Sequence, residues 1–160
     1  HKGITVAQIR QFVHDAEKAD LLVHGCFIIG NPGETRQTME QSLKLAKELN
    51  CDTMQFYPLL VYPGTEAYQW AKENGYLVSE NYDDWADKYG MYRSVLNIPE
   101  LPREEIEAFC RRANREYYLR PRYILMKLRR LLLEPGEIRR TLRGVRTYLK
   151  MLPKSYTQAE

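Results

Sequence analysis

The residues best placed to bind a ligand lie in two loops, each of which follows an apolar run. The first loop comes after Leu21–Ile29, and the second, Tyr62-Pro63-Gly64, comes after Thr53–Val61. A loop that leads from a strand into a helix presents free backbone N–H groups, which suit an anionic or polar ligand. The first loop alone is explained equally well as a turn in which Pro and Gly only set the geometry, and for the second loop alone the structural explanation comes first. The first loop consists of Gly30, Asn31, Pro32, Gly33 and Glu34.

The elements around these loops predict a parallel sheet. The almost continuous apolar run at 21–29 predicts a strand covered on both faces, and 53–61 predicts a second strand. Between them, 35–49 has the apolar spacing of an amphipathic crossover helix, and 65–74 predicts a helix that stops at Gly75. Strand, helix, strand and helix in this order predict a βαβ unit.

The flanking segments are helical or irregular. Thr5 is suited to cap a helix that ends near residue 19, and helices are predicted at 103–119, 123–133 and 138–152. Between residues 76 and 102 no period is clear. Three acidic residues in that segment suit either a cation or a solvated loop with a capping Asp, and the second is favoured. They are Asp83, Asp84 and Asp87.

Charge divides the chain. Residues 1–110 hold 10 Lys and Arg against 17 Asp and Glu, whereas residues 111–154 hold 14 against 3. The basic helix near the end has an apolar stripe, so it suits either packing on its own domain, which is preferred, or an anionic membrane surface. No aromatic–basic motif points to nucleic acid. The stripe is Ile138, Leu142, Val145, Leu149 and Leu152, flanked by Arg139, Arg140, Arg143, Arg146 and Lys150.

Neither cysteines nor histidines form a metal site in the sequence. Cys26, Cys51 and Cys110 have no metal-ligand spacing, and we expect reduced thiols in a cytoplasmic protein. No catalytic or metal-binding residue is assigned. The start at His1 is neither a signal peptide nor an initiator methionine, so we expect the chain to begin within a longer protein.

The two loops in this order resemble the fifth and sixth strand–helix units of radical S-adenosylmethionine enzymes. The resemblance covers residues 3–78 and is carried by Gly25-x-Phe27-Ile28-Ile29-Gly30-x-Pro32-Gly33-Glu34-Thr35, a helix, a strand and Tyr62-Pro63-Gly64-Thr65. It implies an α/β fold, a fragment of a parallel (β/α) partial TIM-type barrel followed by a mainly α-helical extension. The implied parts are barrel units at 1–78, an irregular connection at 79–102 and a basic helical extension at 103–160.

The same resemblance implies a cofactor wall. Ile28 would pack on the adenine of S-adenosylmethionine, and Gly30 would admit the base closely. The backbone of Phe56, Tyr57 and Pro58 would contact the same base. The first loop, from Asn31 through Pro32 and Gly33 to Glu34, would line the site, with Glu34 ordering the loop rather than moving protons.

One departure from the family decides what this chain can do alone. The Cys-x-x-x-Cys-x-x-Cys triplet that binds the family's iron–sulfur cluster is absent. The chain is therefore expected to retain no cofactor and to be inactive alone, with the missing N-terminal part of its parent as a partner. The unpaired sheet edge is expected to be exposed, and oligomerisation would cover it.

A looser resemblance involves the later segment. From Asn81 through Pro121-Arg122-Tyr123 the chain is similar to extensions of cobalamin-binding radical enzymes, such as anaerobic magnesium-protoporphyrin IX monomethyl ester cyclases and hopanoid-associated enzymes. This implies cobalamin in the parent, either a methyltransferase or a cyclase, and an unidentified small-molecule substrate. The rival hypothesis is a non-catalytic α/β binding or membrane-association module, peripheral to the inner face of the membrane.

Overall fold

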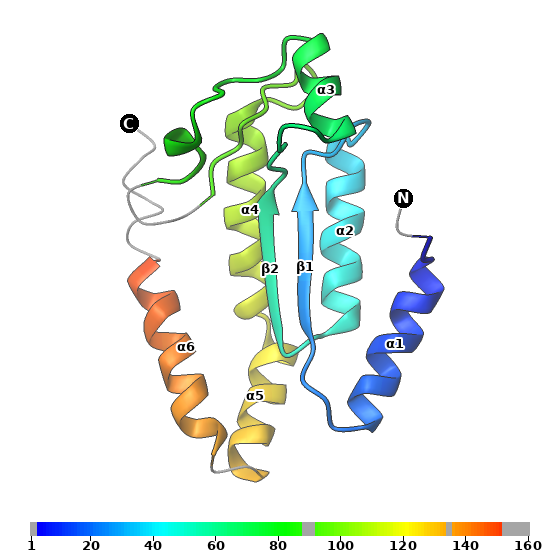
Figure 1. Cartoon of the computed structure of the whole chain (residues 1–160). Helices are drawn as coiled ribbons and strands as arrows, with labels where there is room; N and C mark the ends of the chain where they lie inside the picture. The colour runs from blue at the N-terminus through cyan, green and yellow to red at the C-terminus, as the bar shows by residue number, and fades with distance from the viewer. Residues whose placement is uncertain (1–2, 88–91, 134–135, 152–160) are drawn as a thin grey trace. The chain divides into compact units, whose positions relative to one another are not determined.

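Two compact units make up the chain. The computed structural model describes residues 3–87, 92–133 and 136–151. The first unit extends to Tyr117, and the second begins at Tyr118. In the described ranges the first unit holds both strands and α1 to α4, and the second holds α5 and α6 (Figure 1).

A parallel pair of strands forms the centre of the first unit. Strand β1 (His24–Ile29) pairs with β2 (Thr53–Pro58) in parallel, in a register that runs from His24 opposite Thr53 to Ile29 opposite Pro58. Helix α2 (Arg36–Leu49) connects them and lies beside the sheet (Figure 1). The predicted α/β class with a parallel sheet is confirmed. The described residues form two strands, so the barrel itself stays a prediction.

Threonine caps fix where the helices start. Thr5 accepts a hydrogen bond from Gln8 N at 3.2 Å and begins α1 (Val6–Lys18). Thr35 and Thr38 form the corresponding capping box of α2. Thr65 caps α3 (Glu66–Glu73) through a 3.2 Å bond from Tyr68 N. Each cap satisfies a backbone N–H that the first helical turn leaves free, so the predicted starts are confirmed.

In the described part of the first unit, helices cover one face of the sheet. Phe27 and Ile29 of β1 and Phe56 of β2 point toward the helices, and their rings or methyl groups pack there. Cys26 and Ile28, which alternate with them, are exposed. The prediction of a strand covered on both faces is therefore wrong for the described chain. An apolar run that is continuous in sequence still places alternate residues on opposite faces.

Helix α4 (Arg103–Tyr118) completes the covered face, although the sequence pattern grouped it with the basic extension. Its buried side chains include Ile106, Phe109 and Ala113. The hydroxyl of Tyr117, which is fully buried, donates to Cys51 O at 2.6 Å. These contacts place α4 on the same side of the sheet as the buried side chains of α2, namely Met39, Leu43 and Ala46.

The outer edge of β2 is closed by a side chain of α4. Asn114 accepts a hydrogen bond from Phe56 N at 3.1 Å through Oδ1 and donates to Phe56 O at 2.9 Å through Nδ2. Its amide thereby occupies the N–H and C=O of Phe56, two of the groups that a neighbouring strand would bond. At the edge of β1, Asn31 Nδ2 donates to Ile28 O at 2.9 Å. Neither edge pairs with a third strand in the described residues.

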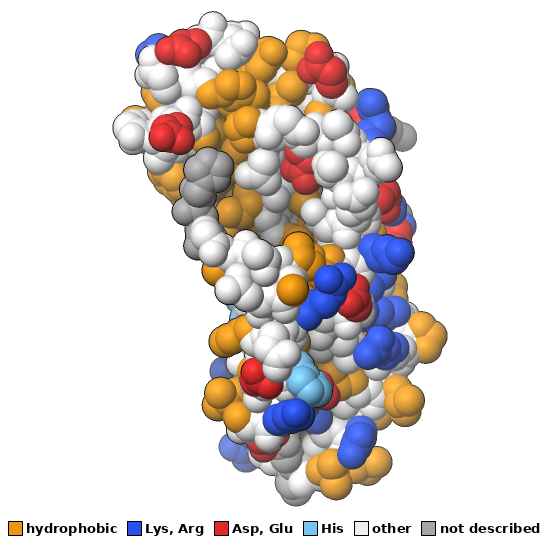
Figure 2. Space-filling model, turned by 90° about the vertical axis from the view of Figure 1, so that its right-hand side faces the viewer, with side chains coloured by type: hydrophobic (Ala, Val, Ile, Leu, Met, Phe, Trp, Pro, Cys, Tyr) orange, Lys and Arg blue, Asp and Glu red, His pale blue; other side chains and the backbone are white. Residues whose placement is uncertain are grey.

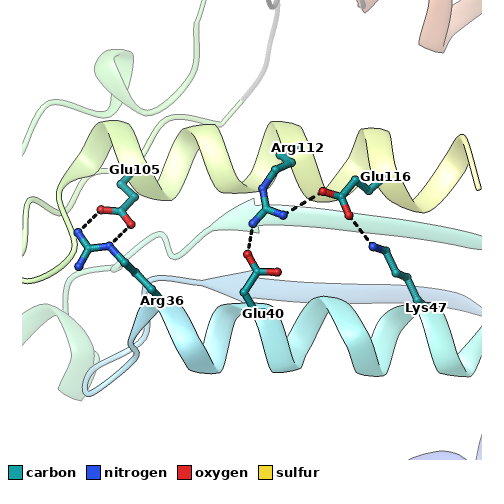
Figure 3. Close-up of polar contacts among 6 residues, drawn as sticks. All are labelled: Arg36, Glu40, Lys47, Glu105, Arg112 and Glu116. Carbon is teal, nitrogen blue, oxygen red and sulfur yellow. Dashed lines mark hydrogen bonds and ion pairs between the residues drawn. The ribbon is translucent and has the colours of Figure 1, made fainter.

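Ion pairs join α4 to α2 along their length (Figure 3). Arg36 forms a bidentate pair with Glu105, with both distances 2.5 Å. Arg112 contacts Glu40 and lies 2.9 Å from Glu116, which in turn lies 2.5 Å from Lys47 Nζ. The side chains remain partly exposed, so each pair adds little stability alone. Together they fix the register of the two helices.

Glutamine in place of Glu116 should lower the free energy of unfolding by about 0.5–1 kcal/mol at neutral pH. The hydrogen bond from Lys47 lowers the pKa of Glu116 below the ordinary 4.5. A carboxyl group with a lowered folded-state pKa stabilises the protein above its unfolded-state pKa, and this stability is lost as pH falls through the folded-state pKa. The difference between the two proteins should be constant above about pH 5 and shrink at lower pH.

Urea unfolding across this pH series measures the difference. Glu104, an exposed residue on the same helix, supplies the matched control Glu104→Gln, for which we expect a change within about 0.5 kcal/mol. A Glu116→Gln effect that keeps its size down to the lowest pH would contradict the assignment of this pair.

The connection between α3 and α4 is irregular but packed. A 3₁₀ helix (Tyr82–Trp85) is capped by Asn81, and Leu77 bridges Leu96 in antiparallel fashion. Ser79 Oγ donates to Asp84 Oδ2 at 2.6 Å. No group of three or more His, Cys, Asp and Glu side chains that could hold a metal lies in the described ranges. The short helix expected at the acidic residues is present, but its cap is Asn81 and not an Asp, so that part of the prediction is wrong.

The second unit is a pair of helices, α5 (Pro121–Leu133) and α6 (Glu137–Met151). Pro121 stands at the first position of α5, where its missing N–H costs nothing. Tyr118 and Tyr123 meet edge to face, with ring centroids 5.1 Å apart. No helix in the described ranges is long and apolar enough to cross a bilayer. The predicted residues Leu149 and Leu152, and the side chains of Arg140 and Lys150, lie outside what the structure describes.

Candidate functional site

The uncovered face of the sheet is the candidate site. We call it the open sheet face and define it by Cys26 and Ile28 of β1 and Gln55 and Tyr57 of β2. These side chains alternate with the buried ones, and Ile28 is 38% exposed. In the parallel register, Ile28 lies opposite Tyr57, and each is the next-to-last residue of its strand. The face is mainly apolar and has one amide, from Gln55.

The open sheet face forms the floor of a hollow of about 320 Å³ at the carboxyl end of the strands. Its wall comes from residues that follow β2 and from one residue of the irregular connection. The Tyr92 ring lies 6.0 Å from that of Tyr57. A hollow with aliphatic and aromatic walls and few polar groups suits a flat, mainly apolar ligand group. The further lining residues are Leu59, Leu60, Tyr62 and Tyr92.

Tyr57 is the titratable group of this floor whose pKa is shifted. Burial, with smaller effects from Cys26 and Tyr92, raises the pKa of its phenol. The phenol therefore stays neutral at physiological pH. It can donate a hydrogen bond or pack its ring, and it does not supply an anion.

The first loop is held by Glu34. One of its oxygens accepts hydrogen bonds from Gly30 N at 2.6 Å and Asn31 N at 3.0 Å. The carboxylate thus occupies two of the N–H groups that the loop would otherwise offer to an anion. Glu34 orders the loop, as expected. Asn31, Pro32 and Gly33 remain exposed around it.

Gly30 has a structural reason to be glycine within the first unit itself. Its φ is +95°, and a Cβ there would lie 3.1 Å from Ile106 Cδ1 of α4. The bare side of Gly30 therefore faces a packed helix rather than the hollow. A close approach of α4 and a left-handed backbone are sufficient causes.

Alanine at Gly30 should lower the free energy of unfolding by about 2–3 kcal/mol, because it adds backbone strain and a contact with Ile106. Gly33 is the matched control: its φ is +78°, but nothing lies within 4 Å of an added Cβ. Gly33→Ala should therefore cost only the strain, about 1 kcal/mol. Equal losses in the two variants, measured by urea unfolding, would mean that the Ile106 contact contributes nothing.

The second loop places an aromatic ring beside the hollow. Thr65 N and Oγ1 donate to Tyr62 O at 3.1 and 2.7 Å, which closes the turn. The ring of Tyr62 packs on Trp85, with centroids 5.2 Å apart. The second loop is therefore a hydrogen-bonded turn, and its residue Tyr62 lines the hollow.

The structure separates the nine residues expected to contact a cofactor. Ile28 and Tyr57 share the open sheet face. Phe56 and Pro58 are buried, and the Phe56 backbone is already bonded to Asn114. The five loop residues lie at the same end of β1 as Ile28, with Gly30 buried.

Several lining residues were not expected from sequence. Cys26 and Gln55 lie two positions before Ile28 and Tyr57, so the period of two could have indicated them. Tyr92 comes from a segment without period and gave no signal. Among the thiols, Cys110 is buried, and this burial raises its pKa to about 12. It is therefore not a nucleophile at neutral pH.

Sequence comparison finds relatives that are much longer than this chain. An uncharacterized methyltransferase of Pyrococcus horikoshii is 36% identical over 124 residues, which are 78% of this chain and 26% of that protein. The chain therefore spans about a quarter of that relative. No protein-family model matches the chain.

Shorter matches occur in two enzymes named tRNA-2-methylthio-N(6)-dimethylallyladenosine synthase. The enzyme of Thiobacillus denitrificans is 34% identical over 45% of this chain and 17% of its own length. The enzyme of Cronobacter sakazakii is 40% identical over 32% of this chain and 11% of its own length. The chain is thus similar, over part of its length, to a protein named a methyltransferase and to two named synthases of a methylthio-modified tRNA nucleoside.

Proposed function

We propose that this chain is the C-terminal part of the barrel, with its helical extension, in a longer radical S-adenosylmethionine enzyme. The observation that carries the proposal is the open sheet face with Ile28 opposite Tyr57 at the carboxyl ends of two parallel strands. A covered outer side and an uncovered, mainly apolar inner side are what a strand pair of a barrel wall requires.

The residues of the open sheet face fit the adenine part of S-adenosylmethionine. Ile28 and Tyr57 would hold the flat adenine ring by apolar contact, and Gln55 would supply a polar group beside it. When bound with its iron–sulfur cluster, S-adenosylmethionine supplies a deoxyadenosyl radical. The chain's own contribution is to orient the nucleoside and to exclude water from it with the side chains of Leu59, Leu60 and Tyr92.

The names of the relatives support the proposal. A methyltransferase and two synthases of a methylthio-adenosine product concern the transfer of methyl or methylthio groups, a chemistry for which S-adenosylmethionine is suited. The coverage of 11–26% of those relatives agrees with a chain that holds one part of a longer enzyme.

Anaerobic reconstitution with iron and sulfide tests whether the cluster ligands lie in the longer protein and outside this chain. The longer protein should contain an upstream Cys-x-x-x-Cys-x-x-Cys and hold iron and sulfide near cluster stoichiometry. The 160-residue chain should hold neither, since its described residues contain no metal-binding group. A longer protein without the triplet, or a cluster bound by this chain alone, would overturn the proposal.

A further inference from the structure

The second unit exposes an apolar stripe on each of its helices. On α5, Leu125, Leu128 and Leu132 are 69%, 51% and 85% exposed. On α6, Leu142 is 63% exposed, and Ile138 and Val145 are also exposed. At about 100° per residue, the positions on each helix fall within one narrow stripe. Large side chains gathered in this way mark a binding surface rather than ordinary surface variation.

Basic side chains flank both stripes. Arg122 and Arg129 are exposed on α5, and Arg139 and Arg146 are exposed on α6. From residue 118 onward the sequence holds 11 Lys and Arg against 3 Asp and Glu, whereas residues 1–117 hold 13 against 18. The occupant of the stripes must therefore combine an apolar interior with a negatively charged rim.

We propose that α5 and α6 together bind the surface of an anionic lipid bilayer. The leucines would enter the boundary between headgroups and acyl chains, and the arginines would contact the lipid phosphates. The helices are 13 and 15 residues long. They would lie in the plane of the interface rather than cross it, since no described helix is suited to span a bilayer.

Two other occupants fit less well. A second copy of this unit would bring two strongly cationic surfaces together, which like-charge repulsion opposes. A nucleic acid would neutralise the arginines but leave the leucines in water. The face drawn in Figure 2 carries both acidic and basic side chains, together with groups of hydrophobic ones.

Vesicle flotation of the 160-residue chain tests the proposal. The chain should float with vesicles of phosphatidylcholine and phosphatidylglycerol and stay behind with phosphatidylcholine alone. The double variant Arg139→Gln, Arg146→Gln should bind about 30-fold more weakly, at about tenfold per 1.4 kcal/mol. Leu125→Gln with Leu132→Gln should bind at least about 10-fold more weakly.

Two double variants in the first unit are the matched controls. Lys18→Gln with Lys44→Gln removes two exposed charges, and Ile4→Gln with Leu21→Gln removes two exposed apolar side chains. Both should float like the parent chain. Circular dichroism should show the helices retained in every variant, and a variant that loses helix is replaced by the single substitution Leu132→Gln.

Three results would overturn the proposal. One is absence of flotation with anionic vesicles. Another is equal flotation with both vesicle types. The third is binding that the arginine variant weakens and the leucine variant leaves unchanged, which would indicate a polyanion such as nucleic acid. If the chain does not bind vesicles but forms a dimer, and the leucine variant is a monomer, the stripes bind a second copy of the chain instead.

Discussion

Alanine at Asn114 is expected to lower the free energy of unfolding of the first unit by about 2–4 kcal/mol. The substitution removes the side chain that bonds both Phe56 N and Phe56 O at the outer edge of β2. It also removes the bond to Cys110 O at 2.9 Å. Since Phe56 lies under α4, water replaces these bonds poorly, and two backbone groups would be left without partners.

Urea unfolding measures the loss, and Asn74→Ala is its control. Asn74 also donates to a backbone carbonyl, that of Trp70, but at an exposed helix end, so its loss should be within about 0.5 kcal/mol. Hydrogen exchange at the Phe56 amide gives a local readout, with faster exchange expected in Asn114→Ala. An unchanged Phe56 amide together with an unchanged stability would contradict the proposed role of Asn114 in closing the edge.

Aspartate at Ile28 is expected to weaken binding of S-adenosylmethionine to the longer protein by at least about 30-fold. The side chain lies on the floor of the hollow, opposite Tyr57, and the change replaces apolar contact with a desolvated charge. Equilibrium dialysis with the reconstituted protein measures the dissociation constant directly. This result rests on the proposed function, whereas the Asn114 result does not.

Leu21→Asp is the matched control for Ile28→Asp. Leu21 is 60% exposed and precedes β1, at the end of the strand opposite the hollow, so the same chemical change should leave binding within about twofold. If Ile28→Asp folds normally and binds S-adenosylmethionine as tightly as the parent, the open sheet face is not the adenosyl site. If both variants lose binding alike, the effect is not local to the hollow.

Local chemistry made the helices and the crossover predictable. Thr5, Thr35 and Thr65 cap as their sequence context indicates, because a cap depends on residues within one turn. The parallel pairing followed from a helix placed between two apolar runs. These features need no knowledge of distant contacts.

Distant contacts decided what the sequence left undetermined. Nothing near Asn114 in the sequence indicates that its amide bonds Phe56, 58 positions earlier. A side chain at position 30 would meet Ile106, which is 76 positions later in the sequence. The uncovered side of β1 depends on the side of the sheet on which α4 packs. Tyr92 enters the hollow from a segment whose sequence has no period. The candidate site was therefore predictable at Ile28 and Tyr57 and not along its wall.

The most direct test of the proposed function is formation of 5′-deoxyadenosine. The longer protein, with its cluster reconstituted anaerobically and reduced, is incubated with S-adenosylmethionine, and the nucleoside products are separated by chromatography. We expect 5′-deoxyadenosine and methionine from the longer protein, a much smaller amount from its Ile28→Asp variant, and none from the 160-residue chain. A longer protein that holds a reduced cluster and binds S-adenosylmethionine but forms no 5′-deoxyadenosine would contradict the account.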